Sequence, residues 1–189
     1  MVDCEVGHLR IATCHDAPAL ASMHITSWRE TYTGLLPDTM LSSLSVEARA
    51  AAWAKIMQEP ATTHSTAIYL AEHQGAIIGF GSCGAQRTDS LKDKGYEGEV
   101  SAIYVLREFQ KRRIGTRLFH AMSSDLQQRG FRAAALWVLR DNLRARRFYE
   151  GCGGKVIAER EDVRHGAVLV ELAYGWPELK ELERLLARE

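Results

Sequence analysis

A basic segment in the middle of the chain has the composition of an anion-binding site. It reads, in order, Gln110, Lys111, Arg112, Arg113, Ile114, Gly115 and Thr116. The residues after it predict a helix from about Ile114, and the first turn of a helix carries unpaired backbone N–H groups and about half a positive charge. Gly115 lets the backbone approach a phosphate closely. We therefore predict a site for a small anion here, with a plain basic start of a helix as the alternative.

The distribution of charge supports a small polyanionic ligand. The chain has 24 Lys and Arg against 24 Asp and Glu, so its formal net charge is zero. Basic residues nevertheless gather in two stretches, five within 107–117 and four within 140–147. A nucleic-acid-binding face would be broader and would give the chain a basic excess, so no nucleic-acid partner is expected. Solvated helix faces are the alternative explanation for both stretches.

Length and composition are those of one ordinary globular domain. The 189 residues are 46% hydrophobic and 25% charged, and they are expected to form a single domain, 1–189. The longest apolar run, residues 133–139, is far shorter than the roughly 20 residues of a membrane span. Neither a signal peptide nor C-x-x-C spacing among the four cysteines is evident, so we expect a cytoplasmic protein with no membrane association, no disulfide and no metal.

The hydrophobic periodicity predicts a mixed α/β (α+β) chain. Strands are expected at 8–12, 66–72, 76–83, 97–106, 132–139, 155–159 and 167–174, and helices at 17–33, 38–58, 114–129 and 142–151, with a further helix from Pro177. Residues 84–95 are predicted to be a polar loop. The run from 97 to 139 is strand, helix, strand, which makes those two strands parallel neighbours through a right-handed crossover.

Two blocks of this sequence resemble the motifs of a known enzyme family. Residues 99–119, EVSAIYVLREFQKRRIGTRLF, are similar to motif A of the GCN5-related N-acetyltransferases (GNAT), whose signature is Gln/Arg-x-x-Gly-x-Gly/Ala after a strand. Residues 139–154, LRDNLRARRFYEGCGG, are similar to motif B at the expected separation. The resemblance extends over nearly the whole chain. It departs from the family where Arg113 replaces the first glycine and where Gly153-Gly154 ends motif B.

The resemblance implies the GNAT fold and a coenzyme. That fold has a central mixed, mostly antiparallel sheet, helices on both faces and a splayed parallel strand pair. Acetyl-CoA, the expected co-substrate, would lie in the gap between the splayed strands, with its pantetheine along the backbone of one strand and its pyrophosphate on the helix start. The implied coenzyme-binding residues are Ile103, Tyr104, Val105, Gln110, Lys111, Arg112, Arg113, Ile114, Gly115, Thr116, Asn142 and Arg146.

Tyr149 and Glu99 are the predicted catalytic residues. Asn142, Ala145 or Arg146, and Tyr149 share one helix stripe, and Tyr149 would protonate the departing thiolate. Glu99 opens the motif A strand, where the enzymes that this sequence resembles often carry a carboxylate, and it would accept the proton of the amine through water. N–H groups near Val105 would stabilise the oxyanion. The alternatives are an N-cap for Asn142, a core tyrosine for Tyr149 and a solvated or salt-bridged glutamate at the strand end for Glu99. Strand alternation puts Glu99, Ser101 and Ile103 on one face unless a bulge intervenes.

Trp28 and Tyr32 are the candidates for acceptor binding. They are four residues apart in a segment similar to the first helix of GNAT enzymes that modify small amines, and they could hold an ammonium by cation–π contact. Packing between the first two helices is the alternative. The resulting hypothesis is an N-acetyltransferase for a small primary amine. A peptide N-terminus or lysine acetyltransferase and a non-catalytic CoA-binding protein are the alternatives, and the resemblance also makes a homodimer plausible.

Overall fold

A seven-stranded sheet forms the centre of the protein. The computed structural model describes residues 7–59, 64, 66–164, 166–180 and 182. The sheet order is β1-β2-β3-β4-β5-β7-β6, and every neighbouring pair is antiparallel except β4 and β5. The strands are β1 (His8–Ile11), β2 (Ala67–His73), β3 (Ala76–Ala85), β4 (Gly98–Val105), β5 (Ala134–Leu139), β6 (Lys155–Arg164) and β7 (Ala167–Trp176). The expected fold class is confirmed.

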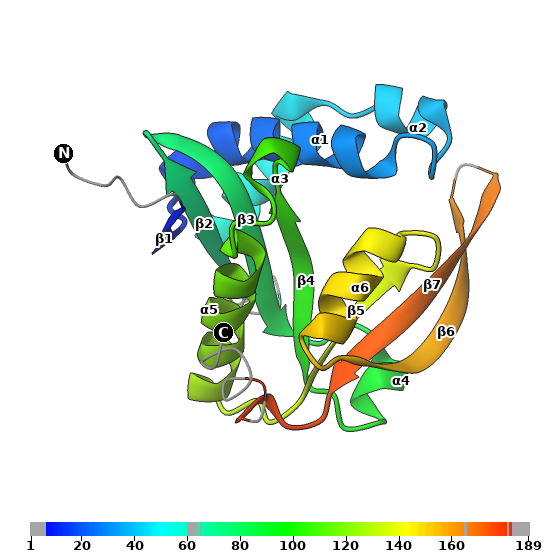
Figure 1. Cartoon of the computed structure of the whole chain (residues 1–189). Coiled ribbons are helices and arrows are strands. Elements are labelled where there is room, and N and C mark those ends of the chain that lie inside the picture. The colour runs from blue at the N-terminus through cyan, green and yellow to red at the C-terminus, as the bar shows by residue number, and fades with distance from the viewer. Residues whose placement is uncertain (1–6, 60–63, 65, 165, 181, 183–189) are drawn as a thin grey trace.

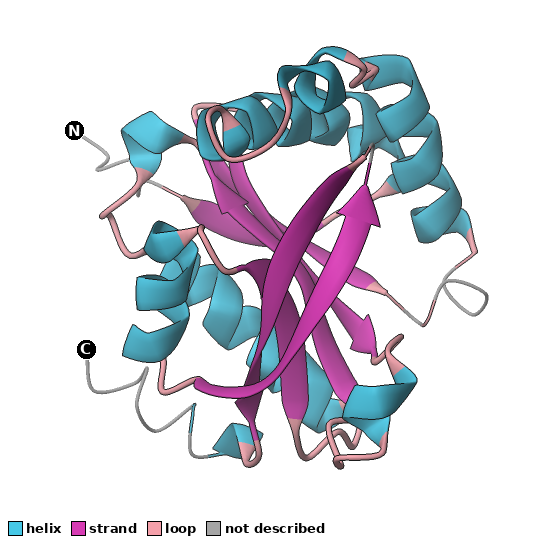
Figure 2. Ribbon diagram, turned by 90° about the vertical axis from the view of Figure 1, so that its right-hand side faces the viewer, coloured by secondary structure: helices cyan, strands magenta, loops and turns pink. Residues whose placement is uncertain are grey.

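Helices cover both faces of this sheet (Figure 2). They are α1 (Ala17–Tyr32), α2 (Asp38–Ser42), α3 (Val46–Gln58), α4 (Asp89–Lys92), α5 (Ile114–Gln128) and α6 (Leu143–Gly151), with short 3₁₀ turns at Cys14–Asp16 and Arg107–Phe109. One core joins α1 and α3 to Leu70 and Phe80 of the sheet. The core on the other face joins α5 and α6 to β5 and β7. The two faces are therefore covered by different helices.

Several predicted boundaries differ from the structure for local reasons. The helical region expected at 38–58 is two helices, because the chain turns at residues 43–45 and the Ser45 side chain accepts a hydrogen bond from Ala48 N at 3.1 Å, capping α3. The predicted loop 84–95 contains the short helix α4. Strands β6 and β7 are longer than expected and form one hairpin. The helix predicted from Pro177 falls largely outside the described residues.

Strands β4 and β5 are parallel neighbours, as predicted, but only at one end. They pair at Gly98↔Ala134 and Glu99↔Ala135 and nowhere further along. From there β4 follows β3 while β5 follows β7, so the two strands diverge toward α1 and α2, which lie across the top of Figure 1. Beyond these two pairs, the backbone N–H and C=O groups on the facing edges of β4 and β5 do not pair with each other.

A β-bulge at Ser101 changes the faces of β4. Cys83 lies opposite Val100 and Ser82 opposite Ala102, so Ser101 is an extra residue. The alternation is interrupted there, and Glu99 and Ile103 point to opposite faces of the sheet. Val100 and Ile103 both pack in the core with α5. Glu99 precedes Val100 in the strand and therefore points to the opposite face of the sheet. The sequence left a bulge open as the exception to a shared face for Glu99 and Ile103, and the structure has that bulge.

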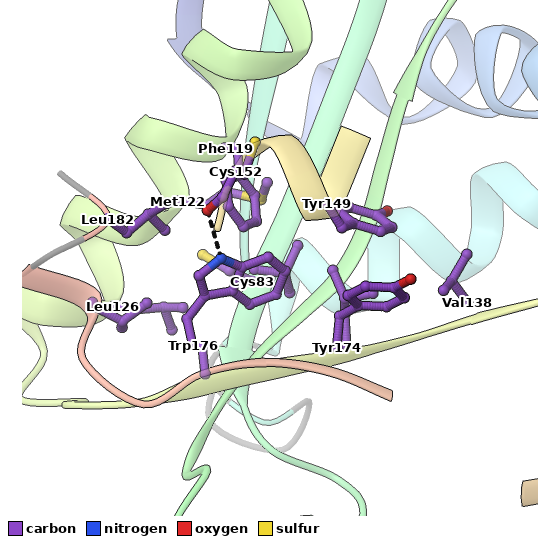
Figure 3. Close-up of a cluster of buried hydrophobic side chains, with 14 of the residues drawn as sticks. Cys83, Phe119, Met122, Leu126, Val138, Tyr149, Cys152, Tyr174, Trp176 and Leu182 are labelled. Carbon is purple, nitrogen blue, oxygen red and sulfur yellow. Dashed lines mark hydrogen bonds between the residues drawn. The ribbon is translucent and has the colours of Figure 1, made fainter. Parts of the chain in front are cut away.

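An aromatic core fixes α6 against α5 and the sheet (Figure 3). The Phe119 ring lies 4.9 Å from Trp176 and 6.4 Å from Tyr149, measured between centroids. Trp176 Nε1 donates to the carbonyl of Cys152 at 2.9 Å, which ties the end of α6 to β7. The position of α6 beside the diverging strands is therefore set by packing. No helix within the described part of the chain is long and apolar enough to cross a membrane.

Candidate functional site

A cavity of about 400 Å³ occupies the place where β4 and β5 diverge. Consecutive residues of each strand point to opposite faces of the sheet, and consecutive residues of both strands line the cavity. The cavity therefore passes from one face of the sheet to the other. Its lining includes Val100 to Val105 of β4, Leu136 to Leu139 of β5, the first turns of α5 and α6, and residues of α1 and β7. A ligand can therefore enter from the α5/α6 face and meet a second ligand from the α1/α2 face.

The α5 end of the cavity is a cationic helix N-terminus. The first helical hydrogen bond runs from Arg117 N to Arg113 O at 2.9 Å, so the N–H groups of Ile114, Gly115 and Thr116 have no partner within the helix. No acidic residue lies in this first turn. Lys111, Arg113, Gly115 and Thr116 all line the cavity. This arrangement attracts and orients an anion.

Arg113 begins this helix in an unusual backbone conformation. Its φ of 60° and ψ of 5° are left-handed, the region where glycine carries no Cβ penalty. The position is the one where the family signature has its first glycine. Arg113 therefore adopts the left-handed conformation that the glycine of the signature would adopt. Its side chain adds a positive charge to the rim of the cavity.

The edge of β4 offers backbone groups to the gap. Leu106 N donates to Ile78 O at 2.9 Å, so Ile103 and Val105, which alternate with Leu106, point their backbone groups toward β5. Gln110 Nε2 already donates to the carbonyl of Val105 at 2.7 Å. Gln110 Oε1 is buried without a hydrogen-bond partner among the described residues. A ligand with a donor group would satisfy that oxygen.

Helix α6 contributes part of its predicted stripe. Asn142 Oδ1 accepts from Ala145 N at 3.2 Å, so Asn142 is the N-cap of α6 and also lines the cavity. Arg146 does not line it, because its Nε donates to Tyr174 Oη at 3.2 Å and its Nη1 to Arg140 O at 2.9 Å. Ala145, the other candidate for this position of the stripe, lines the cavity, as does Arg144.

Two residues of the predicted anion segment do not line the cavity with their side chains. Ile114 is buried in the core beneath α5. The Arg112 guanidinium lies over the Phe109 ring, 5.5 Å from its centroid. The remaining predicted coenzyme residues, Ile103, Tyr104, Val105, Gln110, Lys111, Arg113, Gly115, Thr116 and Asn142, are together in the lining.

Tyr149 reaches the cavity from the α6 side. It is 7% exposed and packs with Phe119 and Trp176, so it is both a core residue and a lining residue. Burial, together with the nearby Tyr32 and Cys152 groups, raises the pKa of the phenol well above its ordinary value. The hydroxyl therefore keeps its proton throughout the neutral range and can serve as a proton donor.

Glu99 lies outside the cavity lining, in an ion pair. Its Oε2 accepts from the backbone N–H of Arg87 at 2.9 Å and from Arg87 Nε at 3.0 Å, and its Oε1 is bound by Arg87 Nη2. This hydrogen bond raises the pKa of the Arg87 guanidinium. The salt-bridged alternative for Glu99 is the one that the geometry favours.

An aromatic wall closes the α1 side. The Trp28 and Tyr32 rings lie 5.2 Å apart between centroids, and Tyr32 Oη lies 2.9 Å from Tyr104 Oη. All three side chains line the cavity, so the predicted acceptor pair does come together there. Trp28 Nε1 is buried and makes no hydrogen bond of normal geometry with the residues described.

His24 packs behind this wall. Trp53 Nε1 donates to its Nδ1 at 3.3 Å, and its ring contacts Trp28, Phe80 and Tyr104. Burial, with a smaller effect of the Arg49 charge, lowers the pKa of His24 to about 3. His24 is therefore a neutral packing residue.

Sequence reasoning missed the β7 contribution to the site. Leu169 and Glu171 line the cavity, as do Leu36 and Trp137. An acid within the apolar stretch 167–174 is a signal that could have drawn attention to Glu171, because a carboxylate in a buried strand is rare unless it has a partner. Within the described residues, no group of three or more His, Cys, Asp or Glu side chains is placed to hold a metal ion.

Comparison with known proteins adds a family and relatives. The model of the acetyltransferase (GNAT) family matches residues 25–153, which include β4, α5 and α6. The uncharacterized N-acetyltransferase YuaI of Bacillus subtilis (strain 168) is 31% identical over 181 residues, covering 95% of this chain and 98% of that protein.

Solved structures share the fold at lower identity. PaiA N-acetyltransferase from Thermoplasma acidophilum, in complex with coenzyme A, has a TM-score of 0.70 and 18% identity, covering 90% of this chain and 99% of that one. The structure of yncA from Salmonella typhimurium with its cofactor acetyl-CoA has a TM-score of 0.67 and 19% identity, covering 92% and 94%.

Proposed function

The chain belongs to the acetyltransferase (GNAT) family, and from this premise we propose that it transfers the acetyl group of acetyl-CoA to a primary amine of a small molecule. The amine attacks directly while both substrates are bound. Acetyl-CoA-dependent N-acetyl transfer is the activity of the family. The small-molecule acceptor and the residue roles below are the proposal.

The observation that carries the proposal is the cavity that crosses the sheet. Its α5/α6 side has a helix N-terminus with Lys111 and Arg113, and its α1 side has Trp28 and Tyr32. A polyanionic coenzyme suits the first side and an amine with an apolar body suits the second. Direct transfer needs the two substrates to meet in one space, which the gap between β4 and β5 provides.

The residues present fit a CoA-type ligand. The N–H groups of the first α5 turn and the flanking cations suit its pyrophosphate, and the β4 edge at Ile103 and Val105 suits the amides of its pantetheine. The orphaned Gln110 Oε1 fits a ligand donor. Bound coenzyme A and acetyl-CoA in the PaiA and yncA structures support this assignment. Acetyl-CoA supplies an activated acyl group as a thioester.

Tyr149 is proposed as the proton donor. When the C–N bond forms and the C–S bond breaks, the leaving sulfur carries negative charge, and the Tyr149 hydroxyl supplies its proton. A raised phenol pKa keeps that proton available at neutral pH. Backbone N–H groups of Ile103 and Val105 on the open edge of β4 are proposed to stabilise the charge on the carbonyl oxygen.

Removal of the amine proton is the second requirement. A lysine-like amine has a pKa near 10.4, so only about one molecule in a few thousand is neutral at pH 7. Glu99 lies on the acceptor side of the sheet and could receive the proton through water. Because protonation would weaken its bonds to Arg87, we propose that Glu99 contributes less than an unpaired carboxylate base would.

Contacts across the acceptor side support a small substrate. Leu36 and Met40 near α2 pack with Leu169 of the β6–β7 hairpin, and Tyr32 and Leu139 pack against them. These contacts bridge the region where a peptide groove would otherwise run. A peptide acceptor is the alternative, and the assay below includes one.

Calorimetric titration with acetyl-CoA, with ATP and NAD as controls, tests the coenzyme. We expect selective binding of acetyl-CoA, weakened at least about 10-fold in the double variant Lys111→Glu/Arg113→Glu by reversal of charge at the helix start. Lys155→Glu is the matched control, since Lys155 is exposed on β6 and does not line the cavity. Equal weakening by the control would contradict the assigned site.

Release of the CoA thiol in the presence of acceptors then tests the transfer. A panel of small primary amines and a set of unstructured peptides with free N-termini and lysines are compared. Turnover with peptides alone would favour the peptide alternative. Binding of acetyl-CoA without turnover on any acceptor would favour the non-catalytic alternative. A cytoplasmic location and a homodimer stay predictions.

A further inference from the structure

The cavity is lined by charged side chains of both signs. Lys111, Arg113 and Arg144 line it at the first turns of α5 and α6. Among the described lining residues, Glu171 is the one carboxylate. It comes from β7, where it lies opposite Leu139 of β5, and it faces the same side of the sheet as Leu169, two residues away. Leu172 and Tyr174 pack on the α6 side of β7, so Glu171 points to the opposite face, which is the acceptor side.

The carboxylate of Glu171 is held in a defined position. Arg160 of β6, directly opposite in the hairpin, contacts its Oε2 with Nε at 2.7 Å and with Nη2 at 2.6 Å. The Arg160 guanidinium in turn lies 4.1 Å from the centroid of the Trp137 ring. Stacking on Trp137 fixes Arg160, and Arg160 fixes Glu171, whose side chain is only 9% exposed.

The Glu171 carboxylate can accept hydrogen bonds from a ligand in addition to those from Arg160. An ionised carboxylate has about four lone-pair positions for donors. Burial in the wall of a cavity strengthens any further charge contact, because the dielectric constant is lower there than in water. Opposite charge and aromatic faces are the two features that recognise an alkylammonium, and the acceptor side combines Glu171 with Trp28 and Tyr32.

We infer that Glu171 is the specificity-determining residue for the acceptor, and that the acceptor binds as a protonated amine with an apolar body. The inference rests on the proposed function for the identity of the second substrate. In this arrangement the ammonium group contacts Glu171 and the aromatic wall receives the body. The proton leaves in a later step, so Glu171 acts in binding and affects the Michaelis constant of the acceptor more than the turnover number.

The test compares two amines of nearly identical shape. 2-Phenylethylamine is protonated at neutral pH, whereas O-benzylhydroxylamine, in which an oxygen replaces one CH₂, is neutral. Each is titrated by calorimetry into the full chain saturated with CoA, where no transfer occurs. We expect Glu171→Gln to weaken binding of 2-phenylethylamine at least 10-fold and to leave O-benzylhydroxylamine within about two-fold.

Arg160→Gln is the matched variant. It breaks the same ion pair but keeps the carboxylate, so 2-phenylethylamine is expected to bind as well as to the wild type or better. Equal losses for both amines in both variants would mean that the pair is only structural and would overturn the inference. Failure of the wild type to bind 2-phenylethylamine would overturn it as well. If Glu171→Gln does not fold, the double variant Glu171→Gln/Arg160→Gln, which leaves no buried charge unpaired, replaces it.

Acetyl transfer is measured separately with acetyl-CoA. Charge-dependent amine binding without any transfer would support the role of Glu171 and contradict the proposed function. Transfer to 2-phenylethylamine with an unchanged Michaelis constant in Glu171→Gln would contradict the inference and leave the proposed function intact.

Discussion

Arg87 holds Glu99 through both its backbone N–H and its guanidinium. The N–H lies 2.9 Å from Glu99 Oε2, and Nε lies 3.1 Å from Oε1. The two residues are 12 positions apart, and the bulge at Ser101 turns Glu99 to the acceptor side of the sheet. The residue that the sequence suggests as a base is thereby placed in an ion pair beside the cavity.

Replacing Glu99 with Gln should therefore have a modest effect on turnover. We expect kcat to fall by less than about 10-fold, below the 10²–10⁴-fold that a general base contributes. Steady-state kinetics from pH 6 to 9 provide the measurement, with Arg87→Gln as the companion variant. A fall of 10²-fold or more in Glu99→Gln would restore Glu99 as the principal base.

Tyr149→Phe should reduce turnover while leaving coenzyme binding intact. The ring stays packed against Phe119 and Trp176, so only the proton donor is lost, and we expect kcat to fall about 10²-fold with little change in the Kd for acetyl-CoA. Tyr69→Phe is the control, because Tyr69 is a partly buried tyrosine outside the cavity lining. Unchanged kcat in Tyr149→Phe would remove Tyr149 from the mechanism.

The raised pKa of Tyr149 also predicts the alkaline side of the pH profile. Its folded pKa lies above the ordinary value of 10.0, so the phenol remains protonated up to at least pH 9. We expect the kcat of the wild type not to fall between pH 7 and 9 as a result of ionisation of Tyr149. A basic limb in this range that disappears in the variant would contradict the assigned shift.

His24 should make the protein less stable in mild acid. Its folded pKa of about 3 is lower than its ordinary 6.5, so the unfolded chain binds the extra proton and stability falls as pH drops from 6.5 toward 3. Between pH 7 and 5 this effect amounts to about 1–2 kcal/mol. Urea unfolding of the wild type and of His24→Gln, which keeps an acceptor for Trp53, measures it. If the free energy of unfolding falls equally with pH in the wild type and in His24→Gln, groups other than His24 are responsible.

Arg113 offers a test that separates backbone strain from charge. Arg113→Gly and Arg113→Ala both remove the guanidinium, but only glycine relieves the left-handed conformation, so the Gly variant should be more stable than the Ala variant by about 1 kcal/mol. Both should weaken acetyl-CoA binding to a similar extent and reduce its dependence on salt. Unfolding and titration at two salt concentrations measure both effects. Equal stability of the two variants would contradict a strained turn at this residue.

Local patterns in the sequence predicted most of the elements and many of the residues that line the cavity. The start of α5, the cap at Asn142 and the pairing of Trp28 with Tyr32 all depend on residues a few positions apart along a helix, and helix geometry makes such neighbours predictable. The parallel crossover from 97 to 139 followed from a topological rule. The boundaries were less accurate, because turns such as that at residues 43–45 depend on single caps.

The sequence by itself determined the family, the fold class and the helix start that suits an anion, since these depend on residues close together in the chain. Tertiary structure alone decided how the side chains meet. Glu99 of β4 pairs with Arg87 in the segment after β3, and Arg146 turns to Tyr174. Glu171, 20 residues beyond the end of α6, joins the cavity from β7. These outcomes depend on the bulge at Ser101 and on the register of the β6–β7 hairpin. Register and bulges arise from contacts between distant segments, which no local pattern of residues encodes.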